Sequence, residues 1–204
     1  MQNNYNCAHR CIIPALTKII RGLDIKSGSG ILDAGCGSGV LINTLYGTGF
    51  TNVWGFDISD AAVNSAKNNF SNIAQRVFKH NAYKPRLPDA MPRDYGLIIS
   101  MEVIEHLYNP KAYLKNLYNW LDKNGYLIIT TPYHGYLKNL LISVANKFER
   151  HFNPLSEGGH IKFFSRGLAS LLLEEEGFET TLFKGVGRAA YIWKSMILVA
   201  RKRQ

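Results

Sequence analysis

The sequence predicts an α/β protein in which helices cover both faces of a mainly parallel sheet. Three observations lead to this class. Short apolar runs alternate with segments of helical periodicity along most of the chain. Glycines and helix-capping residues separate these runs. A strand–helix alternation favours parallel strands joined by crossover helices. With 204 residues, the chain fits a single domain over residues 1–204.

The first 28 residues are expected to form a helical lead-in to this domain. Ile12, Ile13, Leu16, Ile19 and Ile20 recur at helical spacing, which predicts a helix. Glycines at positions 28 and 30 then break the pattern, and the apolar run at 31–32 predicts the first strand.

The next elements follow the strand–helix alternation. We expect strands at 53–56, 77–80, 96–101 and 126–131, with a helix at 60–70. A second clear helix begins at Asn109-Pro110, because asparagine caps helices and proline suits the first turn. Gly125 is predicted to end it.

Residues 132–160 interrupt the alternation. Their amphipathic helix places six apolar residues on one face, namely Leu137, Leu140, Leu141, Val144, Ala145 and Phe148. A long segment beyond the carboxyl end of a strand lies where α/β proteins bind ligands. We therefore interpret it as a lid or substrate-recognition insertion, the alternative being a surface helix without such a role.

The chain is expected to end in a helix and two strands. Ser165 is a helix cap, and Gly177 is the predicted helix end. The strands at 179–186 and 193–200 are joined by a short turn, so they should pair antiparallel.

Composition limits the classes of protein. The chain is 46% hydrophobic and 19% charged, which is typical of a globular protein. No apolar run reaches the roughly 18 residues that a membrane span needs. The polar residues 1–6 do not resemble a secretory signal, and three cysteines without a framework pattern favour a reducing, cytoplasmic setting.

The net charge does not by itself identify a partner. Lys and Arg exceed Asp and Glu by 9, an excess that can attract nucleic acid, membrane surfaces or acidic metabolites. The basic residues are dispersed, however, and Arg201–Arg203 is their one compact cluster.

A glycine-rich loop follows the first predicted strand. The segment Asp33-Ala34-Gly35-Cys36-Gly37-Ser38-Gly39 precedes an apolar helix start. Glycine allows positive φ and lets a ligand approach the backbone, while a helix N-terminus suits a carboxylate. The spacing is G-x-G-x-G rather than the dinucleotide G-x-G-x-x-G, so a pyrophosphate ligand is less favoured.

An acidic residue, Asp57, ends the second predicted strand. A carboxylate at this place can accept hydrogen bonds from both hydroxyls of a ribose. The alternative role for Asp57 is that of a helix cap.

These segments, together with Met101–Leu107, resemble the class I methyltransferase family. The resemblance implies a Rossmann-like, mostly parallel sheet of seven strands whose last strand, near 193–200, is antiparallel. It also implies S-adenosylmethionine as cofactor. The residues that would bind it are Asp33, Gly35, Cys36, Gly37, Gly39, Asp57, Ile58, Asn81, Ala82 and Met101. Asn81 stands where the family commonly has Asp, and its amide oxygen keeps a hydrogen-bond acceptor there.

A second motif contains Glu102, Glu105 and His106, which would share one face if a helix begins there. Carboxylates with an imidazole suit a divalent cation such as Mg²⁺, and His160 or His134 could supply a further ligand. A metal-free polar pocket and a purely structural pairing remain alternatives. His80 and His151 lack partners in the sequence and are expected to be surface or core histidines.

This motif resembles two methyltransferase subfamilies. Residues 102–106 resemble the ubiquinone-biosynthesis O-methyltransferases. With residues 131–133 and 159–165 they also resemble the small-RNA 2′-O-methyltransferases, in which two glutamates and two histidines hold magnesium. Carried over, the catalytic and metal-binding residues are Glu102, Glu105, His106 and His160. In related enzymes the region of His9 and Arg10 often approaches the cofactor carboxylate.

Three functions follow from these patterns. The first is methyl transfer to an oxygen of a small molecule, such as a quinone precursor, phenol or sugar hydroxyl. Nitrogen-methylating signatures such as Asn-Pro-Pro-Tyr are absent from the sequence, and Tyr133, Tyr136, Phe148 and Phe152 could line an aromatic acceptor pocket. The second is metal-dependent RNA 2′-O-methylation, and the third is a non-catalytic domain that binds S-adenosylmethionine. Oligomeric state is not predicted.

Overall fold

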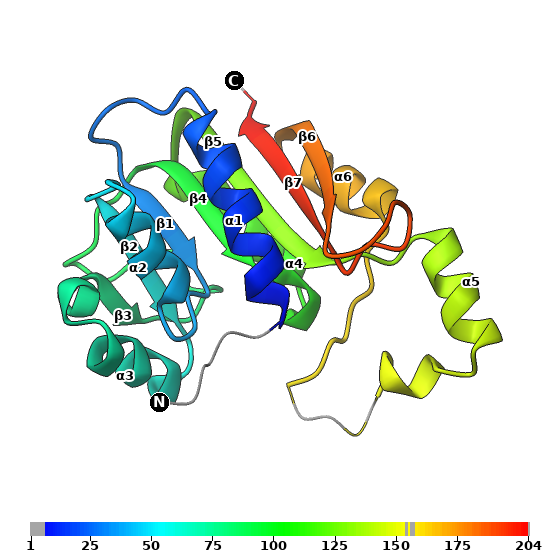
Figure 1. Ribbon diagram of the computed structural model, residues 1–204. Helices are drawn as coiled ribbons and strands as arrows, with labels where there is room; N and C mark the ends of the chain where they lie inside the picture. Colours follow the sequence, from blue (N-terminus) through cyan, green and yellow to red (C-terminus); the bar gives the residue numbers. More distant parts are fainter. Residues whose placement is uncertain (1–6, 154, 156–157, 204) are drawn as a thin grey trace.

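The structure is a computed structural model that describes residues 7–153, 155 and 158–203 (Figure 1). The α-helices are α1 (Cys7–Arg21), α2 (Val40–Gly47), α3 (Asp60–Asn69), α4 (Pro110–Trp120), α5 (Tyr136–Val144) and α6 (Arg166–Glu175). Short 3-10 helices are η1 (Ser71–Arg76), η2 (Ile104–His106) and η3 (Phe148–Arg150). The strands are β1 (Ile31–Ala34), β2 (Val53–Asp57), β3 (Val77–Lys79), β4 (Tyr95–Met101), β5 (Leu121–Pro132), β6 (Phe178–Val186) and β7 (Ser195–Lys202).

The strands form one seven-stranded sheet in the order β3-β2-β1-β4-β5-β7-β6. Strands β1 to β5 are parallel, whereas β7 runs antiparallel to both β5 and β6. The predicted fold class and its antiparallel last strand are therefore confirmed. The order reverses at β1, which lies between β2 and β4, and α/β proteins bind ligands beyond the carboxyl ends of the strands at such a point.

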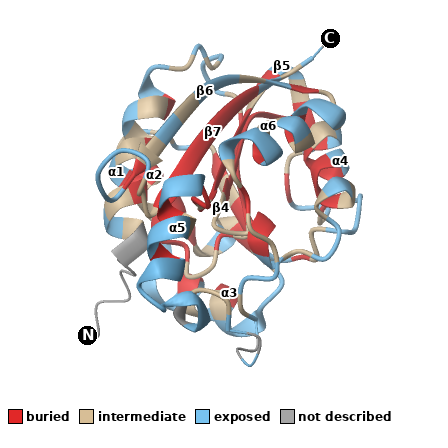
Figure 2. Cartoon of the chain, turned by 90° about the vertical axis from the view of Figure 1, so that its right-hand side faces the viewer, coloured by how far each residue is buried: buried red, intermediate tan, exposed pale blue. Residues whose placement is uncertain are grey.

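Two apolar cores cover the two faces of the sheet. On β4, Leu97 and Ile99 belong to the core that includes residues of α1 and α2, whereas Ile98 belongs to the core with α4 and α6. Successive strand residues point to opposite faces, so a continuous apolar strand supplies both cores. Figure 2 shows the buried strands between helices whose outer surfaces are exposed.

The boundary between α4 and β5 differs from the prediction. Helix α4 ends at Trp120 rather than near Gly125, because Leu121 already pairs with Tyr95 as part of β5. Sheet pairing thus takes over residues that local sequence assigns to the helix.

The segment after β5 leaves the sheet and returns to it. Tyr133 and Phe164 form an isolated parallel bridge that brings its two ends together, and α5 projects beyond them (Figure 1). The expected apolar face of α5 forms, but its residues are exposed; Val144, for example, is 78% exposed. Lys138 and Ile142 are the buried residues of this helix. Within the described residues, no helix has the length and hydrophobicity to cross a membrane.

Candidate active site

A cavity of about 840 Å³ opens beyond the carboxyl ends of β1, β2, β4 and β5. Each parallel strand contributes to it the residues at or just after its end. The lining residues that the sequence singled out as site residues are Gly35, Cys36, Gly37, Asp57, Ile58, Asn81, Ala82, Met101, Glu102, His106 and His160. Sequence positions that are far apart therefore share one cavity because their strands are parallel.

The glycine loop forms the floor of the cavity next to β1. Gly37 has a φ of 51°, and a Cβ atom built on it would meet nothing within 4 Å. The backbone here is open toward the space that a ligand would fill. Gly35 has a φ of 90°, and a Cβ atom there would lie 2.5 Å from Val103 Cγ2. Glycine at position 37 thus keeps the cavity open, and glycine at position 35 permits close packing against the segment after β4.

Asp57 connects the glycine loop to the end of β2. Its Oδ2 accepts a 2.9 Å hydrogen bond from the Gly37 amide, and its Oδ1 accepts one of 2.9 Å from the Ser59 amide. Ser59, not Asp57, caps α3, because its hydroxyl accepts from the Ala62 amide. The helix-cap alternative for Asp57 is therefore wrong. Each Asp57 oxygen retains a lone pair for a further donor, such as a ribose hydroxyl.

Two expected cofactor residues, Asp33 and Gly39, lie outside the cavity lining. Asp33 is fully buried, and neither carboxylate oxygen has a hydrogen-bond partner among the described residues. Burial, followed by the charge of Asp57, raises the pKa of Asp33 to about 8. Gly39 precedes α2 with a φ of 76°, and a Cβ atom there would lie 2.9 Å from Ala66 Cβ.

Asn81 and Ala82 follow β3 and lie in the cavity wall. The side-chain oxygen of Asn81 accepts a 2.9 Å hydrogen bond from the Tyr83 amide. This bond fixes the turn and leaves the amide nitrogen and one oxygen lone pair of Asn81 for a ligand. His80 also lines the cavity, although the sequence offered no partner for it.

Glu102 and Glu105 do not share a helix face, because no α-helix begins at Glu102. Glu102 has a φ of 55°, and only the 3-10 turn η2 follows. The Glu102 oxygens accept hydrogen bonds from the Thr130 hydroxyl at 2.8 Å and the Ser195 hydroxyl at 3.2 Å. Glu102 thus joins the ends of β4, β5 and β7, whereas Glu105 lies with His106 and His160.

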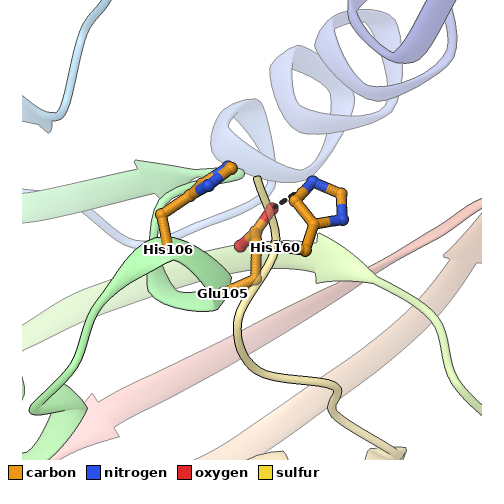
Figure 3. Close-up of side chains that lie close together, drawn as sticks. All are labelled: Glu105, His106 and His160. Carbon is orange, nitrogen blue, oxygen red and sulfur yellow. Dashed lines mark ion pairs between the residues drawn. The ribbon is translucent and has the colours of Figure 1, made fainter. Parts of the chain in front are cut away.

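Glu105, His106 and His160 form a compact cluster whose potential ligand atoms lie within 4.8 Å of one another (Figure 3). His160 Nε2 is 4.0 Å from Glu105 Oε1, and the two imidazole centroids are 4.9 Å apart. The backbone brings His160 here, because the Glu105 carbonyl accepts hydrogen bonds from the Ile161 and Lys162 amides. His106 Nδ1 donates to the Gly159 carbonyl at 3.1 Å, so Nε2 is the ring nitrogen that remains for a further contact.

The Glu105 carboxylate is only 1% exposed. Burial, followed by the charge of Glu102, raises its pKa to about 8. The Thr131 hydroxyl lowers this pKa slightly but is not in hydrogen-bonding geometry, so the carboxylate has no hydrogen-bond donor among the described residues. Burial, His106 and Lys138 lower the pKa of His160, so its imidazole is neutral near pH 7. A buried carboxyl group without a hydrogen-bond donor, beside two imidazoles, fits either a proton acceptor or a divalent cation.

The wall near β5 and β7 is more basic than the sequence suggested. Lys138, His151, Arg188 and Lys194 line it, and His151 had been expected in the surface or core. His134, a possible further metal ligand by sequence, also lines the cavity, but its Nδ1 contacts Asn139 Oδ1 at 3.3 Å. The sequence spacing of these residues did not predict that they share a wall, because they come from α5, its flanking loops and the β6–β7 connection.

The expected aromatic acceptor pocket does not form. None of Tyr133, Tyr136, Phe148 and Phe152 is among the described residues that line the cavity. Tyr133 packs against Trp193, whereas Phe148 stacks on Phe152, which in turn packs behind the lining residue His134. Their side chains stabilise the segment that carries the basic residues.

The sheet order, the glycine loop and the acid at the end of β2 together define a class I S-adenosylmethionine-dependent methyltransferase. A family model described as "Methyltransferase domain" matches residues 9–182, and the chain belongs to that family.

Similar proteins agree with this family. The chain is 24% identical to the ubiquinone biosynthesis O-methyltransferase of Thiobacillus denitrificans, over 82% of this chain and 73% of that protein. It is 26% identical to the mitochondrial ubiquinone biosynthesis O-methyltransferase of Schizosaccharomyces pombe, over 84% of this chain but only 62% of that protein. The crystal structure of magnesium protoporphyrin IX methyltransferase from Synechocystis PCC 6803 with bound SAH has a TM-score of 0.69 at 20% identity, covering 94% of this chain and 82% of that one.

The residues present fit S-adenosylmethionine. Gly37 leaves open space above the loop, and the N-terminus of α2 offers amides to a carboxylate. Asp57, Asn81 and Ala82 line the neighbouring wall toward β2 and β3, where a ribose and a base would lie. The donor side of the cavity is therefore the β1–β2–β3 side.

Proposed function

We propose that this protein transfers a methyl group from S-adenosylmethionine to an oxygen of a small molecule, such as a quinone precursor, a phenol or a sugar hydroxyl. One observation carries the proposal: His160, whose imidazole lines the cavity, lies next to the buried Glu105 carboxyl group, which is not itself a lining residue. The names of the ubiquinone-biosynthesis relatives support oxygen as the acceptor atom.

The chain's own residues have two tasks in such a reaction. When bound, S-adenosylmethionine supplies a methyl group on a sulfonium. Gly37 and Asp57 orient the donor, and orientation alone can contribute on the order of 7–11 kcal/mol in favourable intramolecular reactions. Glu105 or His160 accepts the proton of the acceptor hydroxyl, which is otherwise a poor nucleophile. With a pKa of about 8, Glu105 is mostly protonated near pH 7, so it can act as the base only in the ionised fraction, which grows as the pH rises; His160 is the alternative proton acceptor.

A divalent cation such as Mg²⁺ is a further part of this proposal. Glu105, His106 and His160 would hold it, and it would lower the pKa of an acceptor hydroxyl. Glu102, which the sequence also assigned as a ligand, lies outside this cluster, and its oxygens accept hydrogen bonds from Thr130 and Ser195. Residues 132–160 would act as the recognition segment, since His134, Lys138, His151 and His160 bring it to the cavity wall.

The test is an unbiased search for product. The purified protein is incubated with labelled S-adenosylmethionine and a metabolite extract, and methylated products are identified by mass spectrometry. We expect an O-methylated small molecule, and Glu105→Gln should lower kcat/KM roughly 10²–10⁴-fold, as loss of a general base does. A wild-type protein that binds the cofactor yet methylates nothing would point to a non-catalytic binding domain instead.

RNA 2′-O-methylation is the second candidate, because a glutamate and two histidines cluster in a chain with a net charge of +9. Binding to generic RNA would then weaken steeply as salt rises, since phosphate contacts release counterions. Salt-independent or absent RNA binding, with methylation of a small molecule, would exclude it.

A further inference from the structure

The cavity wall beyond β5 carries three cationic side chains, and Glu102 is the carboxylate that partly offsets their charge. Lys138, Arg188 and Lys194 all line the cavity, and none of the three forms an ion pair with a described residue. Glu102 is the nearby carboxylate that interacts electrostatically with Lys138 and Lys194. Its oxygens already accept hydrogen bonds from Thr130 and Ser195. The wall therefore keeps an excess of positive charge.

Two separate parts of the chain build this wall. Lys138 comes from α5, whereas Arg188 and Lys194 come from the connection between β6 and β7 (Figure 1). Lys138 Nζ donates hydrogen bonds to the Tyr133 carbonyl at 2.6 Å and the Lys194 carbonyl at 3.3 Å, so it ties the two parts together. Lys138 is only 6% exposed, which makes it a charge held in place rather than a mobile surface lysine.

The three cations repel one another in the absence of a ligand. Burial, followed by the charge of Arg188, lowers the pKa of Lys138 to about 8; within that value Glu102 acts in the opposite direction and Lys194 adds to the lowering. Burial, followed by the charges of Lys138 and Arg188, lowers the pKa of His151 in the same wall. An anion bound among these groups would relieve this repulsion and gain charge-assisted hydrogen bonds.

The position of this wall separates it from the donor side. In the sheet order, β7 lies three strand positions from β1, or roughly 14 Å at about 4.8 Å per strand. The ribose side of the cavity lies in the opposite direction, at Asp57 on β2. Glu102 and Glu105 lie between the two, after β4. The basic wall is thus on the acceptor side.

We propose that the methyl acceptor carries an anionic group, a carboxylate or a phosphate, and that Lys138, Arg188 and Lys194 bind it. This inference rests on the proposed function, since it places the anion on the molecule that receives the methyl group. It narrows the acceptors to hydroxylated small acids or phosphates. The lack of the expected aromatic side chains in the described lining agrees with recognition by charge.

The first test measures anion binding without turnover. Benzoate and inorganic phosphate are titrated separately by calorimetry into the protein saturated with S-adenosylhomocysteine, so that the donor side is blocked. We expect one of them to bind, and the variant Arg188→Gln/Lys194→Gln to bind it at least roughly tenfold more weakly. Lys26→Gln/Lys123→Gln removes the same charge from exposed positions outside the lining and should bind as the wild type does.

Each remaining outcome overturns the inference. Equal binding by the wild type and Arg188→Gln/Lys194→Gln, or binding of neither anion, would leave the wall without an anion site. A large loss of S-adenosylhomocysteine affinity in this variant would assign the cations to the donor instead. Short RNA that binds far more tightly than both monomeric anions would replace the small acid by a nucleic acid.

The second test uses turnover with matched acceptors. The pairs are 3,4-dihydroxybenzoate with its methyl ester, and glucose 6-phosphate with glucose, so that the two arms separate carboxylate from phosphate. We expect the charged member of one pair to have the higher kcat/KM, and Arg188→Gln/Lys194→Gln to remove that preference mainly through KM. Methylation of neutral acceptors with no such preference would contradict this inference while leaving O-methylation intact. Anion binding without methylation of any acceptor would contradict the proposed O-methylation while leaving the anion site intact.

Discussion

His160 Nε2 lies 4.0 Å from Glu105 Oε1, although the two residues come from different segments of the chain. Two backbone hydrogen bonds from Ile161 and Lys162 to the Glu105 carbonyl create this proximity. Residues 161 and 162, near the end of the segment that follows β5, are therefore hydrogen-bonded to the turn η2 that carries Glu105. The acceptor side of the cavity is completed by main-chain contacts, which do not depend on the identity of the side chains nearby.

Replacing Asp57 by alanine should weaken S-adenosylhomocysteine binding. The change removes the acceptor of the Gly37 and Ser59 amides and the proposed ribose ligand. Hydrogen bonds to charged groups contribute about 1.5–3 kcal/mol, so we expect a loss of about 10–100-fold. Calorimetry measures it. Asp60→Ala, which removes an exposed carboxylate paired with Lys79, is the control and should keep wild-type affinity. Unchanged binding by Asp57→Ala would remove Asp57 from the donor site.

Gly37→Ala and Gly47→Ala form a matched pair, because a Cβ atom meets nothing within 4 Å at either position. At Gly37 the φ of 51° costs about 1–2 kcal/mol for alanine, and the new methyl group would occupy donor space. We expect lower stability and at least tenfold weaker S-adenosylhomocysteine binding. Gly47 ends α2, where alanine should stabilise by up to about 1 kcal/mol without changing affinity. Urea unfolding and calorimetry distinguish the two, and equal behaviour would contradict the assigned role of Gly37.

The raised pKa of Glu105 predicts a specific pH dependence of stability. Its pKa is about 8 in the folded protein against an ordinary value of 4.5, so between these pH values the folded state holds a proton that the unfolded chain releases. Stability therefore falls as pH rises through this window. Glu105→Gln abolishes this contribution, so the wild type should lose up to about 1.4 kcal/mol per pH unit relative to the variant.

Urea unfolding between pH 5 and pH 8, in the presence of a chelator, measures this difference. The control is Glu179→Gln on β6, whose side chain is exposed, and its curve should parallel that of the wild type. Parallel curves for Glu105→Gln would mean that the carboxylate is not buried in the folded protein in solution.

Glu105→Gln and Glu102→Gln should differ in divalent cation binding. Glu105 lies with His106 and His160, whereas the oxygens of Glu102 are engaged by Thr130 and Ser195. Loss of a ligand should weaken Mn²⁺ or Mg²⁺ binding by at least the roughly 10–100-fold seen for residues that only support ligands. We expect that loss for Glu105→Gln and a smaller one for Glu102→Gln. Equal losses would restore Glu102 as a ligand, and no binding by the wild type would favour the metal-free site.

The sequence alone determined the fold class and predicted which residues form the proposed donor side of the site. Strand–helix alternation predicts a parallel sheet, and a parallel sheet places strand ends at one edge. Residues that follow strand ends, such as Gly37, Asp57, Asn81 and Met101, then line one cavity. No detailed contact is needed for this inference, because periodicity and local turn chemistry are enough.

Only the tertiary structure decided how the acceptor side is built. Glu102 and Glu105 share a helix face only if a helix forms, and the left-handed φ of Glu102 prevents this. The basic wall of Lys138, Arg188 and Lys194 joins two segments that no local pattern relates. Its position depends on long-range contacts, including the Lys138 bonds to two carbonyls and the Tyr133–Phe164 bridge. Local propensity predicts elements, whereas contacts between distant segments decide which side chains meet.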